Sequence, residues 1–329
     1  MRSVPGMIRV MAAVPRDYLA SPEKNAQEIA ALLQKADEEG AELAVFPELC
    51  LCGYTVGDLV SHPALLEGCK KALKTLMELK TRCAFVVGLP LDMTGRLFNC
   101  AAVVAGGKLV GIVPKTHLPN AGEFCERRWF DPGRKAPQST TLFGQTVPVG
   151  SCIFDCGRFS FGVEICEDLW VPAPPSSVLC PAGALFMANL SASNELVTKH
   201  RTRTAMIAQQ STRCRCGYIY ASAGYGESTT DLVFSGYAGI YEGGKRIAEN
   251  ERFARQSNYV LADLDAQGLR FKRRRIHSYE PPYAPEVRTI PFELPAPDGG
   301  AVGGSLPGVS PDFPAGGGLR SALCYFAAV

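Results

Sequence analysis

Short apolar strands in this chain alternate with amphipathic helices, yet several neighbouring strands are joined by tight turns instead. Residues 22–39 carry apolar positions at helical spacing, between the strand-like runs 8–14 and 43–46. In contrast, Gly106-Gly107 directly separates two strand-like runs, and Cys156-Gly157 separates two more, which is the pattern of β-hairpins. A doubly wound parallel sheet does not predict such hairpins. The pattern favours an α/β fold in which two mixed sheets pack face to face, with helices outside.

Size and charge exclude several classes of protein. The 329 residues suffice for one large α/β domain or two small ones. The 34 basic and 32 acidic residues nearly balance, with a net charge of +2, so nucleic acid is not an expected partner. No apolar run reaches the roughly 18 residues that a membrane helix needs, and the N-terminus does not resemble a signal peptide. We therefore expect a cytoplasmic protein that does not bind a membrane.

The 13 cysteines do not form a recognisable metal-binding pattern. None of the close pairs has the spacing C-x-x-C, and no histidine lies at zinc-ligand spacing beside them. Since no secretion signal precedes them, we expect most of the thiols to be reduced and buried as small apolar groups. We therefore expect no metal. The close pairs are Cys50/Cys52, Cys152/Cys156 and Cys214/Cys216.

The composition changes after about residue 265, which predicts a domain boundary there. Residues 272–275 form a basic run, and the chain from residue 280 onward is rich in proline and glycine, as in Pro281-Pro282 and Gly316-Gly317-Gly318. Such a segment buries little apolar surface. We assign residues 1–265 to one domain and residues 266–329 to a Pro/Gly-rich extension that is a remnant of a linker, and we expect the chain from residue 280 onward to be extended or disordered. The last apolar run, residues 319–329, is too short to be a domain.

Three reactive side chains each follow a strand-like run. Glu48 and Lys115 follow runs that end in a proline, and Cys166 directly follows the run 159–165. Catalytic groups from distant positions can converge where strands end at the rim of a sheet. A carboxylate can accept the thiol proton, and an ammonium can stabilise the thiolate and then the oxyanion of a tetrahedral intermediate. Each residue alone is compatible with a structural or surface role, but the three together predict a cysteine nucleophile.

These segments resemble the catalytic motifs of the nitrilase or carbon–nitrogen hydrolase superfamily. The family's glutamate, lysine and cysteine occur in contexts like F-P-E-L, P-K-x-H-L and E-x-C, which here contain Glu48, Lys115 and Cys166. The stretch 124–133 (F-C-E-R-R-W-F-D-P-G) is similar to a further motif, in which Glu126 is the supporting carboxylate that orients the lysine and the thiol. The resemblance covers roughly residues 6–265 and implies a four-layer α-β-β-α sandwich.

Within this superfamily, the chain most resembles the glutaminase domains of glutamine-dependent NAD synthetases. That resemblance implies that Ser193 and Lys199 help to hold the α-carboxylate of glutamine, with Glu167 and Phe124 lining the pocket. The similar segments are residues 49–58 (L-C-L-C-G-Y…G-D), 114–120, 164–177, 189–195 (N-L-S-A-S-N-E), 210–214 (Q-S-T-R-C), 220–224 (Y-A-S-A-G) and 227–234 (E-S-T-T-D-L-V-F).

Two features of the sequence leave parts of this pocket open. His200 and Arg201 are neighbouring cations that could take the place of Lys199. The family often has an aromatic residue within the segment 120–123, where this chain has Ala121. One wall of the pocket is therefore expected to be built differently here.

The resemblance implies hydrolysis of the glutamine amide through a thioester on the cysteine, without a cofactor. The ammonia would serve NAD synthesis from nicotinate adenine dinucleotide in a synthetase domain or subunit that requires ATP and Mg²⁺. The pyrophosphate-loop motif of that domain, S-G-G-x-D-S, does not occur in the chain, so we expect the synthetase domain to be absent. A fragment, a truncated or frameshifted product and a split subunit all remain compatible with this. The family also implies a homo-oligomer.

Three other functions remain to be weighed against this hypothesis. A free-standing amidase or nitrilase acting on another small amide would share the glutamate, lysine and cysteine but would not need the segment 189–195. A non-catalytic assembly subunit would not need the intact set. A cysteine protease needs a paired histidine, and neither His117 nor His200 lies in a recognisable pairing motif.

Overall fold

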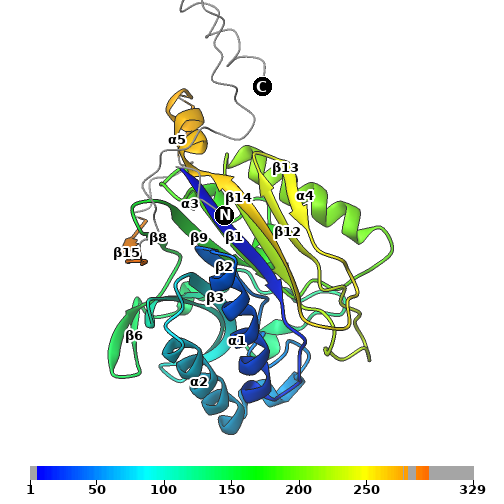
Figure 1. Ribbon diagram of the computed structural model, residues 1–329. Coiled ribbons are helices and arrows are strands. Elements are labelled where there is room, and N and C mark those ends of the chain that lie inside the picture. Colours follow the sequence, from blue (N-terminus) through cyan, green and yellow to red (C-terminus); the bar gives the residue numbers. More distant parts are fainter. Residues whose placement is uncertain (1–5, 277, 281–286, 296–329) are drawn as a thin grey trace, which may run out of the picture. The chain divides into compact units, whose positions relative to one another are not determined.

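In a computed structural model the chain forms two large mixed sheets that pack face to face, with helices on their outer faces (Figure 1). The structure describes residues 6–276, 278–280 and 287–295. The prediction of two mixed sheets with helices outside is confirmed, and so is the four-layer α-β-β-α order that the resemblance implied. None of the helices in this described part is both long and apolar enough to span a membrane.

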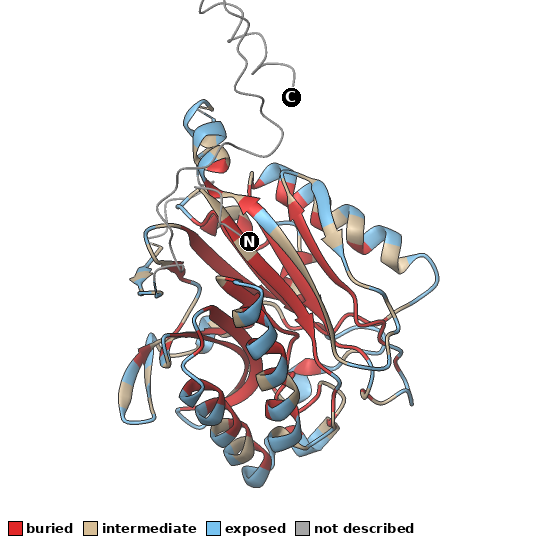
Figure 2. Ribbon diagram, viewed as in Figure 1, coloured by how far each residue is buried: buried red, intermediate tan, exposed pale blue. Residues whose placement is uncertain are grey.

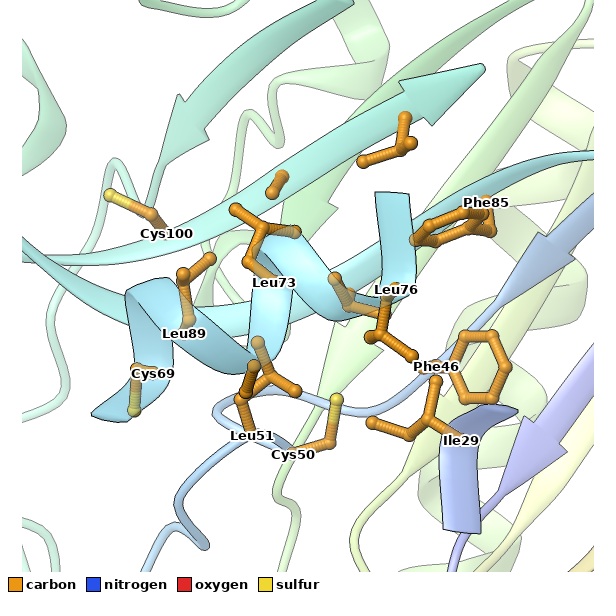
Figure 3. Close-up of a cluster of buried hydrophobic side chains, with 14 of the residues drawn as sticks. Ile29, Phe46, Cys50, Leu51, Cys69, Leu73, Leu76, Phe85, Leu89 and Cys100 are labelled. Carbon is orange, nitrogen blue, oxygen red and sulfur yellow. The ribbon is translucent and has the colours of Figure 1, made fainter. Parts of the chain in front are cut away.

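The first sheet is covered by α1 (Pro22–Glu38) and α2 (Pro63–Glu78). These helices pack side by side, and their apolar faces bury Ile29, Leu73 and Leu76 against Phe46 and Phe85 of the sheet side (Figure 3). The other faces of both helices are exposed (Figure 2). In spatial order the strands are β14 (Asn258–Asp265), β1 (Met7–Val14), β2 (Leu43–Val45), β3 (Ala84–Met93), β4 (Arg96–Ala105) and β5 (Lys108–Pro114).

The second sheet contains the parallel strands β9, β10 and β11, flanked by antiparallel strands. Its outer face packs against α3 (Ser176–Leu179) and α4 (Lys199–Arg213). In spatial order the strands are β13 (Lys245–Glu249), β12 (Ala238–Glu242), β11 (Gly217–Ser222), β10 (Phe186–Ser191), β9 (Ser160–Ile165), β8 (Ile153–Asp155) and β15 (Thr289–Pro291).

An apolar layer between the two sheets holds them together. Alternate residues of β1, such as Val10 and Ala12, face Ile219 and Ala221 of β11 across this layer, and all four are fully buried. Because strand side chains alternate, the other residues of these strands reach the helical layers instead. Strands buried on both faces explain why 8–14 and 159–165 read as almost continuous apolar runs.

Several elements differ from the sequence-based expectations. The segment 232–234, which reads as a strand, forms only an isolated bridge between Phe234 and Asn194. The sequence predicts a helix over residues 197–213, but α4 begins only at Lys199, because Thr198 takes a left-handed backbone conformation (φ +73°). The hairpin of β6 (Ser139–Leu142) and β7 (Gln145–Pro148), and the edge strand β13, carry too few apolar residues for the sequence to predict them.

The described residues after Asp265 pack on the sandwich. α5 (Ala266–Arg274) buries Leu269, and β15 extends the second sheet beside β8. Within the predicted basic run, the Arg273 guanidinium donates hydrogen bonds to four backbone carbonyls, of Cys180, Ala184, Cys214 and Arg215. The segments 281–286 and 296–329, which include the Pro281-Pro282 and Gly316-Gly317-Gly318 runs, lie outside the described residues. The division at residue 265 stays a prediction.

Candidate active site

Glu48 lies in the turn that follows β2, where the backbone of the first sheet approaches the second. The Glu48 amide donates a hydrogen bond of 3.3 Å to the carbonyl of Ser191, the last residue of β10. The turn also crosses β3 so closely that a Cβ on Gly88 would lie 2.2 Å from the Leu49 nitrogen. Only glycine leaves room for this crossing. The position of Glu48 at the boundary between the two sheets therefore depends on Gly88, which lies on the neighbouring strand β3.

Lys115 follows β5 in the same first sheet. Its amide donates a 2.8 Å hydrogen bond to the Asn99 carbonyl on β4, which continues the ladder one residue past the strand. Its carbonyl accepts a 2.7 Å hydrogen bond from the Gly133 amide, and a Cβ at Gly133 would lie 2.7 Å from the Pro114 carbonyl oxygen. The segment 124–133 is thus pinned to the lysine strand end, which brings Glu126 beside Lys115.

The Lys115 ammonium joins two carboxylates in a fully buried array. Its Nζ donates 2.6 Å hydrogen bonds to Oε1 of Glu48 and to Oε1 of Glu126. The Asn99 amide donates to the same Glu48 oxygen at 2.6 Å, and the Tyr54 hydroxyl donates to Glu126 at 2.9 Å. The second carboxylate oxygens, Oε2 of Glu48 and of Glu126, are buried, and no group in the described part of the chain forms a hydrogen bond with them. Each carboxylate therefore keeps one buried oxygen free to accept a proton.

Burial and charge act against each other in this array. Burial by itself lowers the pKa of Lys115, but the Glu126 and Glu48 carboxylates outweigh it and hold the pKa above its ordinary value. Desolvation raises the pKa of Glu126 to about 7, although Lys115 opposes the shift. The lysine is therefore a firmly charged ammonium, whereas Glu126 titrates near neutral pH.

Cys166 follows β9 in the second sheet and opens the short 3₁₀ helix η4 (Cys166–Leu169). Its backbone is left-handed (φ +46°), a conformation that is unfavourable for a non-glycine residue and that the surrounding structure must hold in place. Desolvation and the nearby Glu48 carboxylate raise the pKa of the thiol, while Lys115 partly opposes them. The resting thiol is therefore protonated, with a carboxylate and an ammonium within electrostatic reach.

Asp168 ties the cysteine turn to the lysine turn. Its buried carboxylate accepts hydrogen bonds from the backbone amides of Ile165 (3.0 Å) and His117 (2.8 Å). The His117 ring also contacts it at 3.0 Å, and this contact raises the pKa of the histidine. Ile165 directly precedes Cys166, and His117 lies two residues after Lys115. The Asp168 side chain therefore holds the turn with Cys166 in a defined position relative to the turn with Lys115.

Lys199 lies at the rim of this centre, at the start of α4. Its half-buried ammonium stands 5.6 Å from the centre of the Phe124 ring and 5.4 Å from that of Trp170, and it donates a hydrogen bond to Asn194. Glu167 is half-buried, and desolvation raises the pKa of its carboxyl. Lys199 and Phe124, which the resemblance assigned to the substrate pocket, are therefore in contact.

Ser193 is buried beside a cation that the sequence did not single out. Arg203 of α4 is fully buried, forms a 2.7 Å ion pair with Glu195 and directs Nη1 toward the Ser193 hydroxyl at 3.5 Å. The neighbouring candidates differ: His200 contacts Arg203 and Tyr237, and Arg201 is exposed. Of the cations weighed from the sequence, Lys199 is the one that contacts Phe124 and Trp170.

The site contains groups that sequence reasoning missed, namely Tyr54, Asn99 and Asp168. Asp168 had a local signal, because it lies two residues after the nucleophile in the E-D-L-W turn. Tyr54 lies in the resembling segment 49–58 and Asn99 in no motif, but neither was assigned to the site, since only the fold brings them to Glu126 and Glu48. Among the described residues, no group of three or more His, Cys, Asp or Glu side chains is arranged to hold a metal ion.

The fold and this site place the chain among enzymes of the nitrilase superfamily. Residues 8–274 match the sequence profile of the carbon–nitrogen hydrolases, and the chain belongs to that family. The strand ends that carry Glu48, Lys115 and Cys166 all fall within the matching residues.

Within this family, the chain is similar to glutamine-dependent NAD(+) synthetases. The glutamine-dependent NAD(+) synthetase of Mycobacterium tuberculosis is 37% identical over 284 residues, which cover 84% of this chain but 41% of that protein. A solved glutamine-dependent NAD(+) synthetase from Cytophaga hutchinsonii superposes with a TM-score of 0.72 at 26% identity, covering 78% of this chain and 43% of that one. A nitrilase-superfamily amidase from Nesterenkonia (TM-score 0.65, 18% identity, 84% and 98% covered) shares the fold. The chain thus spans less than half the length of these synthetases.

Proposed function

We propose that this chain hydrolyses the side-chain amide of glutamine through a thioester on Cys166, and that the ammonia supports NAD synthesis from nicotinate adenine dinucleotide. The observation that carries this proposal is the buried Glu48–Lys115–Glu126 array within electrostatic reach of a protonated thiol. The likeness to glutamine-dependent NAD(+) synthetases over 84% of the chain supports glutamine as the substrate.

The first half-reaction forms the thioester. Glu48 takes the thiol proton while sulfur attacks the amide carbon, and the carbonyl electron pair moves to oxygen. The Lys115 ammonium and the backbone N–H of Glu167, in the first turn of η4, stabilise this oxyanion. When the intermediate collapses, the carbon–nitrogen bond breaks and Glu48 returns the proton to the departing ammonia. Glu126 holds Lys115 in place throughout, because it binds the same ammonium from the other side.

The second half-reaction releases glutamate. Glu48 takes a proton from water, whose oxygen attacks the thioester carbon, and collapse of the intermediate expels the Cys166 thiolate. The protonated Glu48 then returns its proton to sulfur, so the enzyme ends as it began. The covalent route divides one difficult acyl transfer into two easier ones. No cofactor takes part in these steps.

We also propose that a synthetase domain or subunit receives the ammonia. ATP and Mg²⁺ would be used by this domain or subunit. The match covers 41% and 43% of two relatives' length, which leaves room in those proteins for such a domain. A homo-oligomer and a cytoplasmic location stay predictions from the resemblance and from the sequence.

The test of the nucleophile is Cys166→Ala. Wild-type protein should release ammonia and glutamate from glutamine, whereas the variant should fall to background because it lacks the sulfur that forms the acyl bond. Cys156→Ala is the matched control, since that half-buried thiol lies in the β8–β9 turn. Thermal unfolding should show that both variants fold. Retained glutaminase activity in Cys166→Ala would overturn the mechanism.

The substrate is tested by a panel of glutamine, other small amides and nitriles. A glutamine-like electrophile such as diazo-oxo-norleucine should add once, at Cys166, as shown by mass spectrometry of the digested protein. Turnover of nitriles or simple amides without glutaminase activity would instead identify a free-standing amidase or nitrilase.

A further inference from the structure

The amide of Asn194 bridges two opposite charges at the rim of the candidate site. Its Oδ1 accepts a hydrogen bond from the Lys199 ammonium, and its Nδ2 donates one to the Glu123 carboxylate. Asn194 itself is buried, while Glu123 is exposed and Lys199 half-buried. A buried amide therefore fixes the relative positions of two charged groups that remain open to solvent.

Asn194 stands between the two charged groups. Lys199 and Glu123 do not pair directly, although both belong to the described residues; each bonds to Asn194 instead. The Lys199 ammonium rests against Phe124 and Trp170, which shield one side of it. An ammonium has three donors and a carboxylate several acceptor positions, so both groups keep hydrogen-bonding capacity for a ligand.

Two opposite charges held next to each other are complementary to the head group of an α-amino acid, whose ammonium and carboxylate share one carbon. We propose that Glu123 binds the α-ammonium group of the substrate, so that Asn194 and Lys199 complete a site for the zwitterion. This inference rests on the proposed glutaminase function and adds a specificity-determining residue to it. Glu123 would reject amides that have a similar chain but lack the amino group.

The other two nearby carboxylates are less suited to this role. Glu195 is already engaged by Arg203 and Arg252. Glu167 directly follows the nucleophile in η4. It therefore lies toward the reacting amide, whereas the ammonium of the substrate has to lie beside the cation that binds the carboxylate on the same carbon.

The experiment compares L-glutamine with glutaramate, which has the same amide and carboxylate but no amino group. For wild-type protein we expect kcat/KM for glutamine to exceed that for glutaramate by about 10- to 100-fold, the range for one charge-assisted hydrogen bond. Glu123→Gln should lower kcat/KM for glutamine by a similar factor, mainly through KM. It should change kcat/KM for glutaramate by no more than about twofold, because that substrate has no ammonium to lose.

Two further variants make the result specific. Glu78→Gln, on the exposed face of α2, removes the same charge outside the candidate site and should leave the preference for glutamine unchanged. Equal effects of Glu123→Gln on both substrates, or a loss of the preference in Glu167→Gln but not in Glu123→Gln, would overturn the inference while leaving the glutaminase proposal intact. Hydrolysis of glutaramate without hydrolysis of glutamine by wild-type protein would overturn both.

Discussion

Burial of charge determines what single residues can do in this site. Lys115, Glu48 and Glu126 are each about 1% exposed, so their charges are stabilised by one another and not by water. The two carboxylates keep Lys115 charged, whereas desolvation favours the neutral forms of Glu126 and of the Cys166 thiol. A protonated thiol needs a base at the moment of attack, and this need gives Glu48 its proposed role.

The raised pKa of Glu126 predicts a specific pH dependence of stability. As pH rises from about 4.5 to 7, this carboxyl ionises in the unfolded chain but stays protonated in the folded one, so its contribution to stability is lost as pH passes the folded pKa of about 7. Relative to Glu126→Gln, the free energy of unfolding of wild-type protein should fall by about 1–3 kcal/mol across this window. Urea denaturation of both proteins at pH 5 and pH 8 measures it. A pH-independent difference would contradict the assignment.

At the scale of elements, each catalytic side chain lies in a turn just past a strand. Strands β2, β5 and β9 form hydrogen bonds with neighbouring strands, and these bonds fix where each strand ends. The turns that follow the strands therefore have well-defined positions. The positions also depend on residues elsewhere in the fold: Gly88 on β3 admits the Glu48 turn, and Gly133 admits the Lys115 turn. The positions of the catalytic side chains therefore depend on how each turn packs against a neighbouring element.

Gly88→Ala tests this dependence. The added Cβ would lie 2.2 Å from the Leu49 nitrogen and 2.6 Å from the Pro47 carbonyl oxygen, so the turn that carries Glu48 must move. A displacement of about 1 Å can cost roughly 100-fold in rate, and we expect a loss of kcat/KM of that order.

Gly95→Ala is the control for Gly88→Ala, because a Cβ at Gly95 meets nothing within 4 Å, although its φ of +73° is unfavourable for alanine. That variant should lose about 1 kcal/mol of stability and keep its activity. Steady-state kinetics and thermal unfolding separate the two outcomes. Unchanged activity in Gly88→Ala would show that the turn tolerates displacement.

At the scale of the whole molecule, the site exists only because two sheets meet. Glu48 and Lys115 come from the first sheet and Cys166 from the second, and Asp168 and the Glu48–Ser191 backbone hydrogen bond connect the two. α5 closes one end of the sandwich through Leu269 and the carbonyl bonds of Arg273.

Truncation tests whether the domain ends at residue 265. A chain ending at Asp265 loses α5, whereas one ending at Arg275 keeps it. Loss of a buried leucine and of a guanidinium that satisfies several carbonyls should cost about 3–5 kcal/mol, so the shorter chain should unfold at a clearly lower temperature. Equal unfolding temperatures for the two chains would support the boundary at residue 265.

The sequence by itself determined the elements that carry the chemistry. Periodicity predicted α1, glycine turns predicted the β4–β5 and β8–β9 hairpins, and apolar runs predicted the strands before Glu48, Lys115 and Cys166. These signals are local, because a helix face or a tight turn is set by residues only a few positions apart. The edge strand β13 also follows a glycine turn, at Gly243-Gly244, but its residues are mostly polar and exposed, so the sequence did not predict it.

Tertiary structure alone decided which groups meet. Tyr54 joins Glu126 across 72 positions and Asn99 joins Glu48 across 51, while Asn194 spaces Lys199 from Glu123. The same is true of the electrostatics: a carboxyl such as that of Glu126 titrates near neutral pH because the packed sheets exclude water from it. Contacts between distant positions and the exclusion of water from buried side chains both arise only when the chain folds. A short segment of the sequence therefore cannot predict either of them.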